Sequence, residues 1–271
     1  MAWLRVETAH LLPWLRRSLT ELLRSLGPTQ WGAPTVCGDW TVGDIAAHML
    51  GVELGNVSIR RDGAHAMGPD PDGHERFGVW LAEFNDQWVG AARRLSPRVI
   101  SDLLDLSGIW FEDHVSALRS DNMGPSVAWA GPSPAPVWMD IAREYTERWV
   151  HQQQIREVVG EEGLLEPVYV APVIATFVHA LPMALDDVVA AEGTAVVFEV
   201  EGEAGGVWHL VRKGEDWDLQ PGEHREARTR VTTSADNAWR MFTRHPNTVR
   251  PTAVGDARIT DAVAGAVAII D

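Results

Sequence analysis

Cysteine and lysine are almost missing from this 271-residue chain, and its charge is far from balanced. A single cysteine, Cys37, excludes an internal disulfide framework. With 38 acidic against 23 basic side chains, the formal net charge is -15, which repels nucleic acid and anionic membrane surfaces. We therefore expect no nucleic-acid or membrane partner, and instead a small molecule or another protein. Lys213 is the only lysine, a usage that suggests a GC-rich genome.

Long apolar runs and nucleotide-binding loops are also absent. No stretch approaches about 18 consecutive apolar residues, so the sequence predicts no membrane-spanning helix. Polar residues interrupt residues 1–19, unlike the uncharged apolar core of a signal peptide, and we expect a cytoplasmic protein. The glycine-rich patterns that cradle phosphates, G-x-G-x-x-G and G-x-x-x-x-G-K-[ST], do not occur, which argues against nucleotide chemistry.

What is present is a long series of helical patterns. Leucines at helical spacing indicate a helix in residues 3–26, although Pro13 requires this helix to begin beside it or to bend there. Thr41 and Asp44 are suited to cap the start of a second helix, which carries His48. Further helices are expected at residues 77–95, 96–118, 137–160 and 172–191.

The pattern changes after residue 190. Segments 195–201 and 206–213 alternate apolar and polar side chains and are separated by a turn-like GEAG, which predicts a β-hairpin. The sequence therefore predicts a mainly α N-terminal bundle, residues 1–190, and a small α+β C-terminal domain, residues 191–271. Further strands are expected at residues 216–219 and 229–233, helices at 235–244 and 260–270, and loops at 63–73 and 124–136.

Residues 140–160 place Glu147 and His151 four residues apart within one helical pattern. Side chains at this spacing lie on the same face of a helix and can converge on one atom beside it, as two ligands of a metal do. Such pairs also arise by chance, as surface pairs or as a buried histidine whose hydrogen bonds are satisfied. The spacing alone leaves both interpretations open.

Two motifs resemble a known family. Residues 35–51, TVCGDWTVGDIAAHMLG, resemble the opening of the second helix in the mycothiol-dependent maleylpyruvate isomerase family, a branch of the DinB-like four-helix-bundle superfamily. Residues 147–160, ERWVHQQQIREVVG, resemble its second signature, in which an E-x-x-x-H pair leads into a helix end. Asn85 and the Leu-Ser-Pro junction at 95–97 are also similar, and residues 191–271 resemble the sterol-carrier-like domain of many members. The resemblance covers nearly the whole chain and implies a DinB-like four-helix bundle.

The resemblance implies a divalent metal, usually zinc, held by a histidine of the second helix and by a glutamate and a histidine of the fourth. In this sequence those residues are His48, Glu147 and His151. Two imidazoles and one carboxylate leave a coordination position open, as catalytic zinc sites do. Glu144 is a rival ligand, but it is two turns from His151 and would have to reach further. In thiol-dependent members the open position accepts mycothiol, the low-molecular-weight thiol of actinobacteria, and the metal activates its sulfur.

Three functional classes follow from this ligand set. The first, which the resemblance favours, is an enzyme that uses mycothiol as cosubstrate to transfer a thiol to a small electrophile or to isomerise one. The second is a hydrolase or lyase that activates water with the same metal, and the third is a non-catalytic member that binds a small molecule.

Cys37 has no histidine adjacent in sequence, so we expect it to pack in a loop and not to act as a nucleophile. His114 and His179 are in predicted helices and could line a cavity of the bundle. We expect a monomer or a homodimer.

Overall fold

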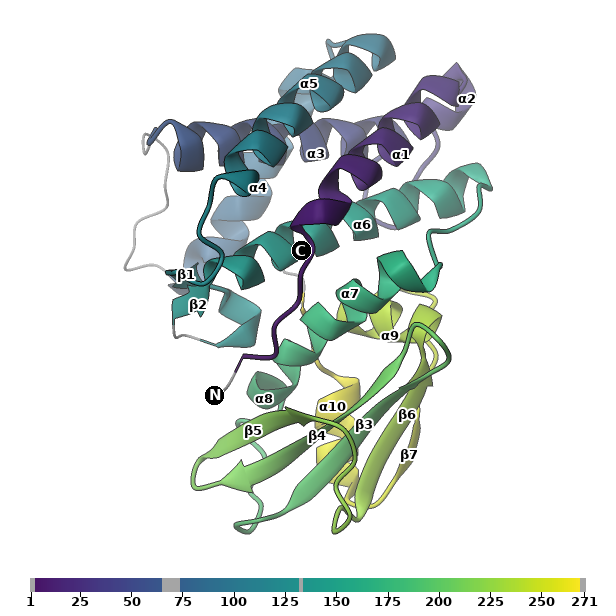
Figure 1. Cartoon of the computed structure of the whole chain (residues 1–271). Helices are drawn as coiled ribbons and strands as arrows, with labels where there is room; N and C mark the ends of the chain where they lie inside the picture. The colour runs from purple at the N-terminus through teal and green to yellow at the C-terminus, as the bar shows by residue number, and fades with distance from the viewer. Residues whose placement is uncertain (1–2, 65–73, 132–133, 269–271) are drawn as a thin grey trace. The chain divides into compact units, whose positions relative to one another are not determined.

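The computed structural model describes residues 3–64, 74–131 and 134–268. These residues form a mainly helical N-terminal part and a C-terminal part with a five-stranded sheet (Figure 1), which confirms the predicted fold class. The loop predicted at residues 63–73 lies almost entirely outside the described residues.

Contacts between residues group the chain into two compact units, which we call the helical unit and the sheet unit. The helical unit consists of Ala9–Arg119 and Glu147–Gly163, and the sheet unit consists of Met1–Thr8, Ser120–Thr146 and Leu164–Ile270. This division differs from the single boundary expected between residues 190 and 191, because α7 (Pro167–Phe177) packs on α9 (Ala235–Phe242) and therefore groups with the sheet. Helix α6 (Val137–Val159) contributes residues to both units.

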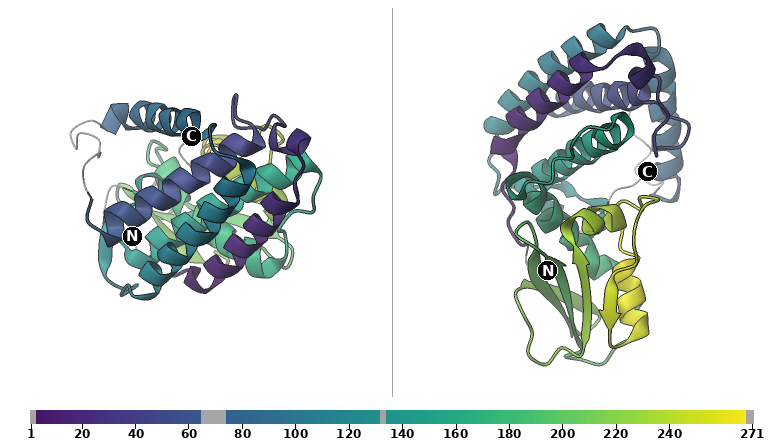
Figure 2. Two further views of the ribbon diagram at one scale, coloured as in Figure 1. Left: turned by 90° about the horizontal axis from the view of Figure 1, so that it is seen from above. Right: turned by 90° about the vertical axis from the view of Figure 1, so that its right-hand side faces the viewer.

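In the helical unit, α3 packs on α4 and α5, and α1 packs on α5 (Figures 1 and 2). Leu12 begins α1 with Pro13 in the first turn, so of the two expected alternatives the helix begins beside this proline and does not extend back to residue 3. A buried cluster of leucine, isoleucine and alanine side chains from α1, α3 and α5 forms the core, and Ile155 of α6 joins it. The helices are η1 (Ala9–Leu11), α1 (Leu12–Ser25), α2 (Pro28–Trp31), α3 (Val42–Asn56), η2 (Val57–Arg61), α4 (His74–Ala92) and α5 (Pro97–Ser116).

In the sheet unit, the predicted hairpin of β3 (Ala195–Glu201) and β4 (Gly206–Lys213) is confirmed. The strand order is β5-β4-β3-β6-β7, with β3 parallel to β6 and the other neighbours antiparallel. Helices α9 and α10 cover one face of this sheet (Figures 1 and 2). The other strands and helices are β5 (Asp216–Pro221), β6 (Thr229–Ser234), β7 (Thr252–Val254), α8 (Leu181–Ala184), η4 (Val178–Ala180) and α10 (Ala257–Ala264).

Three expectations from the sequence differ from the observed elements. The helix expected at residues 172–191 begins at Pro167 and is divided into α7, η4 and α8, since Pro182 begins a new helix. The last helix lies earlier than residues 260–270, because Asp256 caps its start and Gly265 follows its end. Short elements occupy much of the loop expected at 124–136, namely β1 (Met123–Ser126), η3 (Ala128–Ala130) and β2 (Pro134–Pro136).

One helical stretch, Pro167–Ala184, is long and apolar enough by length and composition to cross a membrane, with a mean hydropathy of 1.5. This stretch differs from the expectation that the sequence contains no membrane-spanning helix. Of its residues, 56% are buried inside the protein, and the buried core helix of a soluble protein passes the same test. The stretch is therefore weak evidence for a membrane span.

Candidate metal centre

Helix α3, which carries His48, begins at a reciprocal hydrogen-bonded cap. The Thr41 hydroxyl accepts a hydrogen bond from the Asp44 backbone N–H at 3.2 Å, and the Asp44 carboxylate accepts one from the Thr41 N–H at 3.0 Å. Arg93, which directly follows α4, donates to the same carboxylate at 2.9 Å. Burial acts to raise the pKa of Asp44, but the hydrogen bonds from Arg93 and Thr41 outweigh it and hold the pKa below its usual value. The cap predicted from the sequence is confirmed.

A glycine lets α4 approach α3 one turn after His48. A Cβ atom on Gly51 would lie 2.5 Å from the indole ring of Trp88, so only glycine leaves room for this ring. The Trp88 indole N–H donates to the carbonyl oxygen of Ala47 at 2.7 Å. The backbone next to His48 is thereby held against α4.

The structure brings His48, Glu147 and His151 together within the helical unit. The imidazole rings of His48 and His151 have centroids 5.0 Å apart and are nearly perpendicular, at 78°. The Glu147 carboxylate lies one turn before His151 on α6, with its Oε2 3.9 Å from His151 Nε2. A histidine from α3 therefore meets a histidine and a glutamate from α6, although about a hundred residues separate the helices in sequence.

Each histidine has a neighbour that fixes its ring. Trp40 packs on His48 with ring centroids 5.0 Å apart, and the Trp40 indole N–H donates to Asp86 of α4 at 3.1 Å. His151 Nδ1 lies 2.8 Å from the side-chain oxygen of Gln154. Burial, together with the charge of His151, lowers the pKa of His48 to about 3. His48 is thus a neutral imidazole at neutral pH, the form that binds metals.

The chemistry of these three side chains fits a divalent metal. Two neutral imidazoles and one carboxylate are the donor set of an open catalytic zinc site. Donor atoms around tetrahedral zinc are about 3.3–3.6 Å apart, given bonds of about 2.0–2.2 Å. The 3.9 Å between Glu147 and His151 exceeds this by only a few tenths of an ångström. In the described part of the chain, no group of three or more His, Cys, Asp or Glu side chains is positioned to hold a metal ion without some movement. The metal site therefore stays a prediction.

The other candidates from the sequence have separate surroundings. The Glu144 carboxylate is almost fully buried in the sheet unit and accepts a hydrogen bond from Arg143. His179 is also buried in the sheet unit, where Trp3 stacks on it and its Nε2 accepts a hydrogen bond from the backbone of Leu4. We therefore keep Glu147 as the carboxylate ligand.

Residues 12–156 match the family described as "Mycothiol maleylpyruvate isomerase N-terminal domain", and this match spans more than half of the chain. The chain belongs to this family. All three candidate ligands lie within the matched region.

Two solved structures share the fold of this family member. They are crystal structures of the mycothiol-dependent maleylpyruvate isomerase, with a TM-score of 0.53, and of a histidine-to-alanine mutant of it, with a TM-score of 0.52. Each is 12% identical to this chain, and each alignment covers 90% of this chain and 92% of the other. At this identity the likeness concerns the fold. No curated protein matches the chain.

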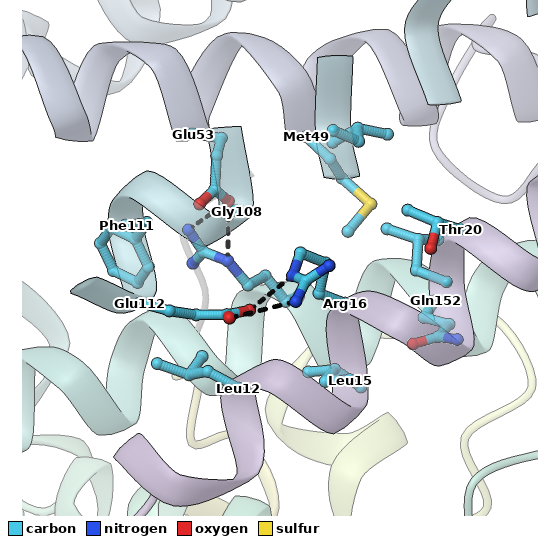
Figure 3. Close-up of a pocket in the computed structure, with 13 residues that line it drawn as sticks. Leu12, Leu15, Arg16, Thr20, Met49, Glu53, Gly108, Phe111, Glu112 and Gln152 are labelled. Carbon is cyan, nitrogen blue, oxygen red and sulfur yellow. Dashed lines mark hydrogen bonds and ion pairs between the residues drawn. The ribbon is translucent and has the colours of Figure 1, made fainter. Parts of the chain in front are cut away.

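A cavity of about 30 Å³ lies in the helical unit of this family member, between α1, α3, α5 and α6 (Figure 3). Arg16 and Glu112 form one ion pair on its wall, with Arg16 Nε 2.7 Å from Glu112 Oε1. Arg148 donates to Glu53 at 2.6 Å, and its guanidinium lies 4.3 Å from the ring centroid of Phe111. Neither His114 nor His179, which were expected to be possible lining residues, borders this cavity.

Two polar contacts, one at the candidate metal site and one on the cavity wall, were not predicted from the sequence. Gln154 follows His151 by three residues, which is a helical contact distance and could have been noticed. The pairing of Glu53 with Arg148 joins residues 95 positions apart and has no local signal.

Proposed function

We propose that the chain is a divalent-metal-dependent enzyme in which His48, Glu147 and His151 hold the metal, and that zinc is this metal. We further propose that it uses mycothiol, a low-molecular-weight thiol, as cosubstrate and acts on a small electrophilic substrate. The reaction would be thiol transfer to that substrate or its isomerisation. The observation that supports this most is the meeting of the two imidazole rings, at 5.0 Å, beside the Glu147 carboxylate.

Membership of the family supports the thiol part of the proposal, since the family description and both similar crystal structures name mycothiol and maleylpyruvate isomerase. A bound divalent cation lowers the pKa of a coordinated thiol, so that a nucleophile is available at neutral pH. We propose a cytoplasmic location and a monomer or homodimer, as expected from the sequence.

The residues around the proposed site would orient and shield the ligands. Burial keeps His48 neutral and so ready to coordinate without losing a proton. Trp40 restrains the His48 ring by packing on it, while Gln154 restrains the His151 ring by hydrogen bonding. Glu147 would supply the single negative charge of the ligand set, which leaves a net positive site for a thiolate.

Metal analysis of the purified protein tests the ligand assignment. We expect about one zinc ion per chain in the wild type and a loss of most of this metal in His48→Ala, because one of three protein ligands is gone. His114→Ala is the matched control, since this histidine lies on α5 whereas the candidate ligands lie on α3 and α6, and its metal content should be unchanged. A wild type without stoichiometric metal, or a His48→Ala variant that keeps it, would contradict the proposal.

Thiol dependence is tested on the metal-loaded protein. We expect mycothiol to raise the thermal unfolding temperature of the wild type and not that of His48→Ala, because a ligand that binds only the folded state stabilises it. Activity screens on small electrophiles should then require mycothiol. Turnover that is equal with and without thiol would point instead to a hydrolase or lyase, and thiol binding without turnover to a non-catalytic member.

A further inference from the structure

The side-chain oxygen of Gln154 lies within hydrogen-bond distance of both His151 and Cys37. His151 Nδ1 is 2.8 Å from it, and the Cys37 thiol donates to it at 3.2 Å. Gln154 is only 8% exposed, so water has little access to this contact. The cysteine therefore has a specific neighbour next to the candidate metal centre, although its sequence suggested only packing in a loop.

A neutral imidazole carries one proton, and its hydrogen-bond partner decides which nitrogen holds it. The Gln154 oxygen can only accept, so this contact favours the tautomer with the proton on Nδ1 and the lone pair on Nε2. Nε2 is the nitrogen that faces Glu147 at 3.9 Å. If the Gln154 amide were rotated by half a turn, its NH₂ group would face Nδ1 and favour the opposite tautomer, in which Nε2 carries the proton and cannot bind a metal.

The Cys37 thiol opposes this rotation because it donates to the same oxygen. A tight turn holds Cys37 in place: its backbone N–H donates to the Thr35 hydroxyl at 3.2 Å, and its carbonyl accepts from the Trp40 N–H at 3.0 Å. The Thr35 hydroxyl in turn donates to the Trp40 carbonyl at 2.7 Å. One turn thus presents Cys37 to Gln154 and, through its last residue, the Trp40 ring to His48.

We propose that Gln154, held by Cys37, is a positioning residue that sets the tautomer of His151, with the proton on Nδ1 and the Nε2 lone pair as the donor to the metal. The inference rests on the proposed function in that it assumes a metal at His151. Mutating a group that accepts the second ring N–H of a ligating histidine typically lowers metal affinity or activity 10–100-fold.

Substitutions at position 154 separate hydrogen bonding from packing. Gln154→Leu introduces an apolar side chain of similar size that has no acceptor, so we expect the zinc affinity, measured by competition with a chelator, to fall about 10–100-fold. Gln154→Glu keeps the acceptor and should bind zinc at least as tightly as the wild type. Cys37→Ala should cause a smaller loss than Gln154→Leu, since the acceptor remains and only its restraint is removed.

Gln153→Leu is the matched control. Gln153 is its neighbour on α6 and is 2% exposed, so the same substitution removes a buried amide without touching the contact to His151. It should leave the zinc affinity unchanged. A loss in Gln153→Leu equal to that in Gln154→Leu would mean that disturbance of α6 explains both, and would overturn the proposal.

The imidazole ¹⁵N shifts of the metal-free protein provide a second readout, which a purely structural role of Gln154 would not move. His151 is identified among the ten histidines by the signals lost in His151→Gln. We expect the proton on Nδ1 in the wild type and in Gln154→Glu, and a shift toward the other tautomer in Gln154→Leu. A wild-type His151 with its proton on Nε2, or a Gln154→Leu variant with unchanged tautomer and zinc affinity, would overturn the proposal.

The two readouts separate failure of this inference from failure of the proposed function. If the wild type takes up no zinc but the ¹⁵N shifts change as expected in Gln154→Leu, the metal proposal fails and the tautomer proposal stands. If the wild type binds zinc and Gln154→Leu binds it equally well, the metal proposal stands and the role of Gln154 fails.

Discussion

Replacing Arg148 with methionine should destabilise the helical unit strongly. Arg148 of α6 binds Glu53 of α3 through its Nε at 3.0 Å and its Nη2 at 2.6 Å, and the two side chains are only 13% and 7% exposed. The substitution leaves a buried carboxylate without its main cationic partner, which typically costs about 3–5 kcal/mol. It also removes the cation–π contact with Phe111, worth about 0.5–2 kcal/mol, which methionine replaces in part. Native proteins typically have unfolding free energies of about 5–15 kcal/mol. Arg148→Met would therefore remove a large share of the unfolding free energy.

The double variant Glu53→Met, Arg148→Met provides the decisive comparison. Removing both charges replaces a buried ion pair with apolar side chains, a change that is often neutral or stabilising. We therefore expect the double variant to be at least 2 kcal/mol more stable than Arg148→Met alone, by about the coupling energy of such a pair. Native-state hydrogen exchange, followed by mass spectrometry on peptides of α3 and α6, measures this local unfolding free energy without assuming that the two units unfold together. A cost below 1 kcal/mol for Arg148→Met, or a double variant as unstable as the sum of the single ones, would refute the reasoning.

Two further predictions concern stability. Gly51→Ala should lower the unfolding free energy, measured by urea titration, by about 1–2 kcal/mol. The new methyl group would lie 2.5 Å from the Trp88 ring, and the cost of displacing this ring exceeds the gain in helix propensity. Gly55→Ala in the same helix meets nothing within 4 Å and should instead be slightly stabilising in the same titration. Burial lowers the pKa of His179 to about 4 in the folded protein, so the unfolded chain binds the extra proton first and stability falls as the pH drops from about 6.5 to 4. Between pH 7 and pH 5, His179 should lower the unfolding free energy by about 2 kcal/mol. In His179→Gln, the fall in unfolding free energy over this pH range, measured by urea unfolding, should be smaller by that amount. An equal fall in the variant would mean that other groups cause the acid sensitivity.

Local signals in the sequence predicted where several elements begin. Pro13 marked the first turn of α1, and Thr41 and Asp44 marked the cap of α3, because capping and proline geometry involve residues only a few positions apart. Alternating side chains predicted the β3-β4 hairpin for the same reason. The last helix was misplaced, since the Asp256 cap and the following Gly265 were weaker signals than the apolar run beyond them.

The sheet order could not be read from the sequence in this way. Strand β6 follows β5 in the chain but pairs in parallel with β3, and β7, which was not predicted, adds to its other edge. Pairing of strands that are not neighbours in sequence depends on which apolar faces the surrounding helices can cover, and short segments such as Thr252–Val254 carry too little pattern to be recognised.

The sequence by itself determined the helical N-terminal part, the hairpin and, through two motifs, the identities of His48, Glu147 and His151 as candidate ligands. Only the tertiary structure decided that His48 meets His151 at 5.0 Å and that Cys37 reaches Gln154 across 117 residues of sequence. The reason is physical: the helical spacing of Glu147 and His151 is a property of one helix, whereas the approach of α3, α6 and the turn at Cys37 results from side-chain packing between segments that are far apart in the chain.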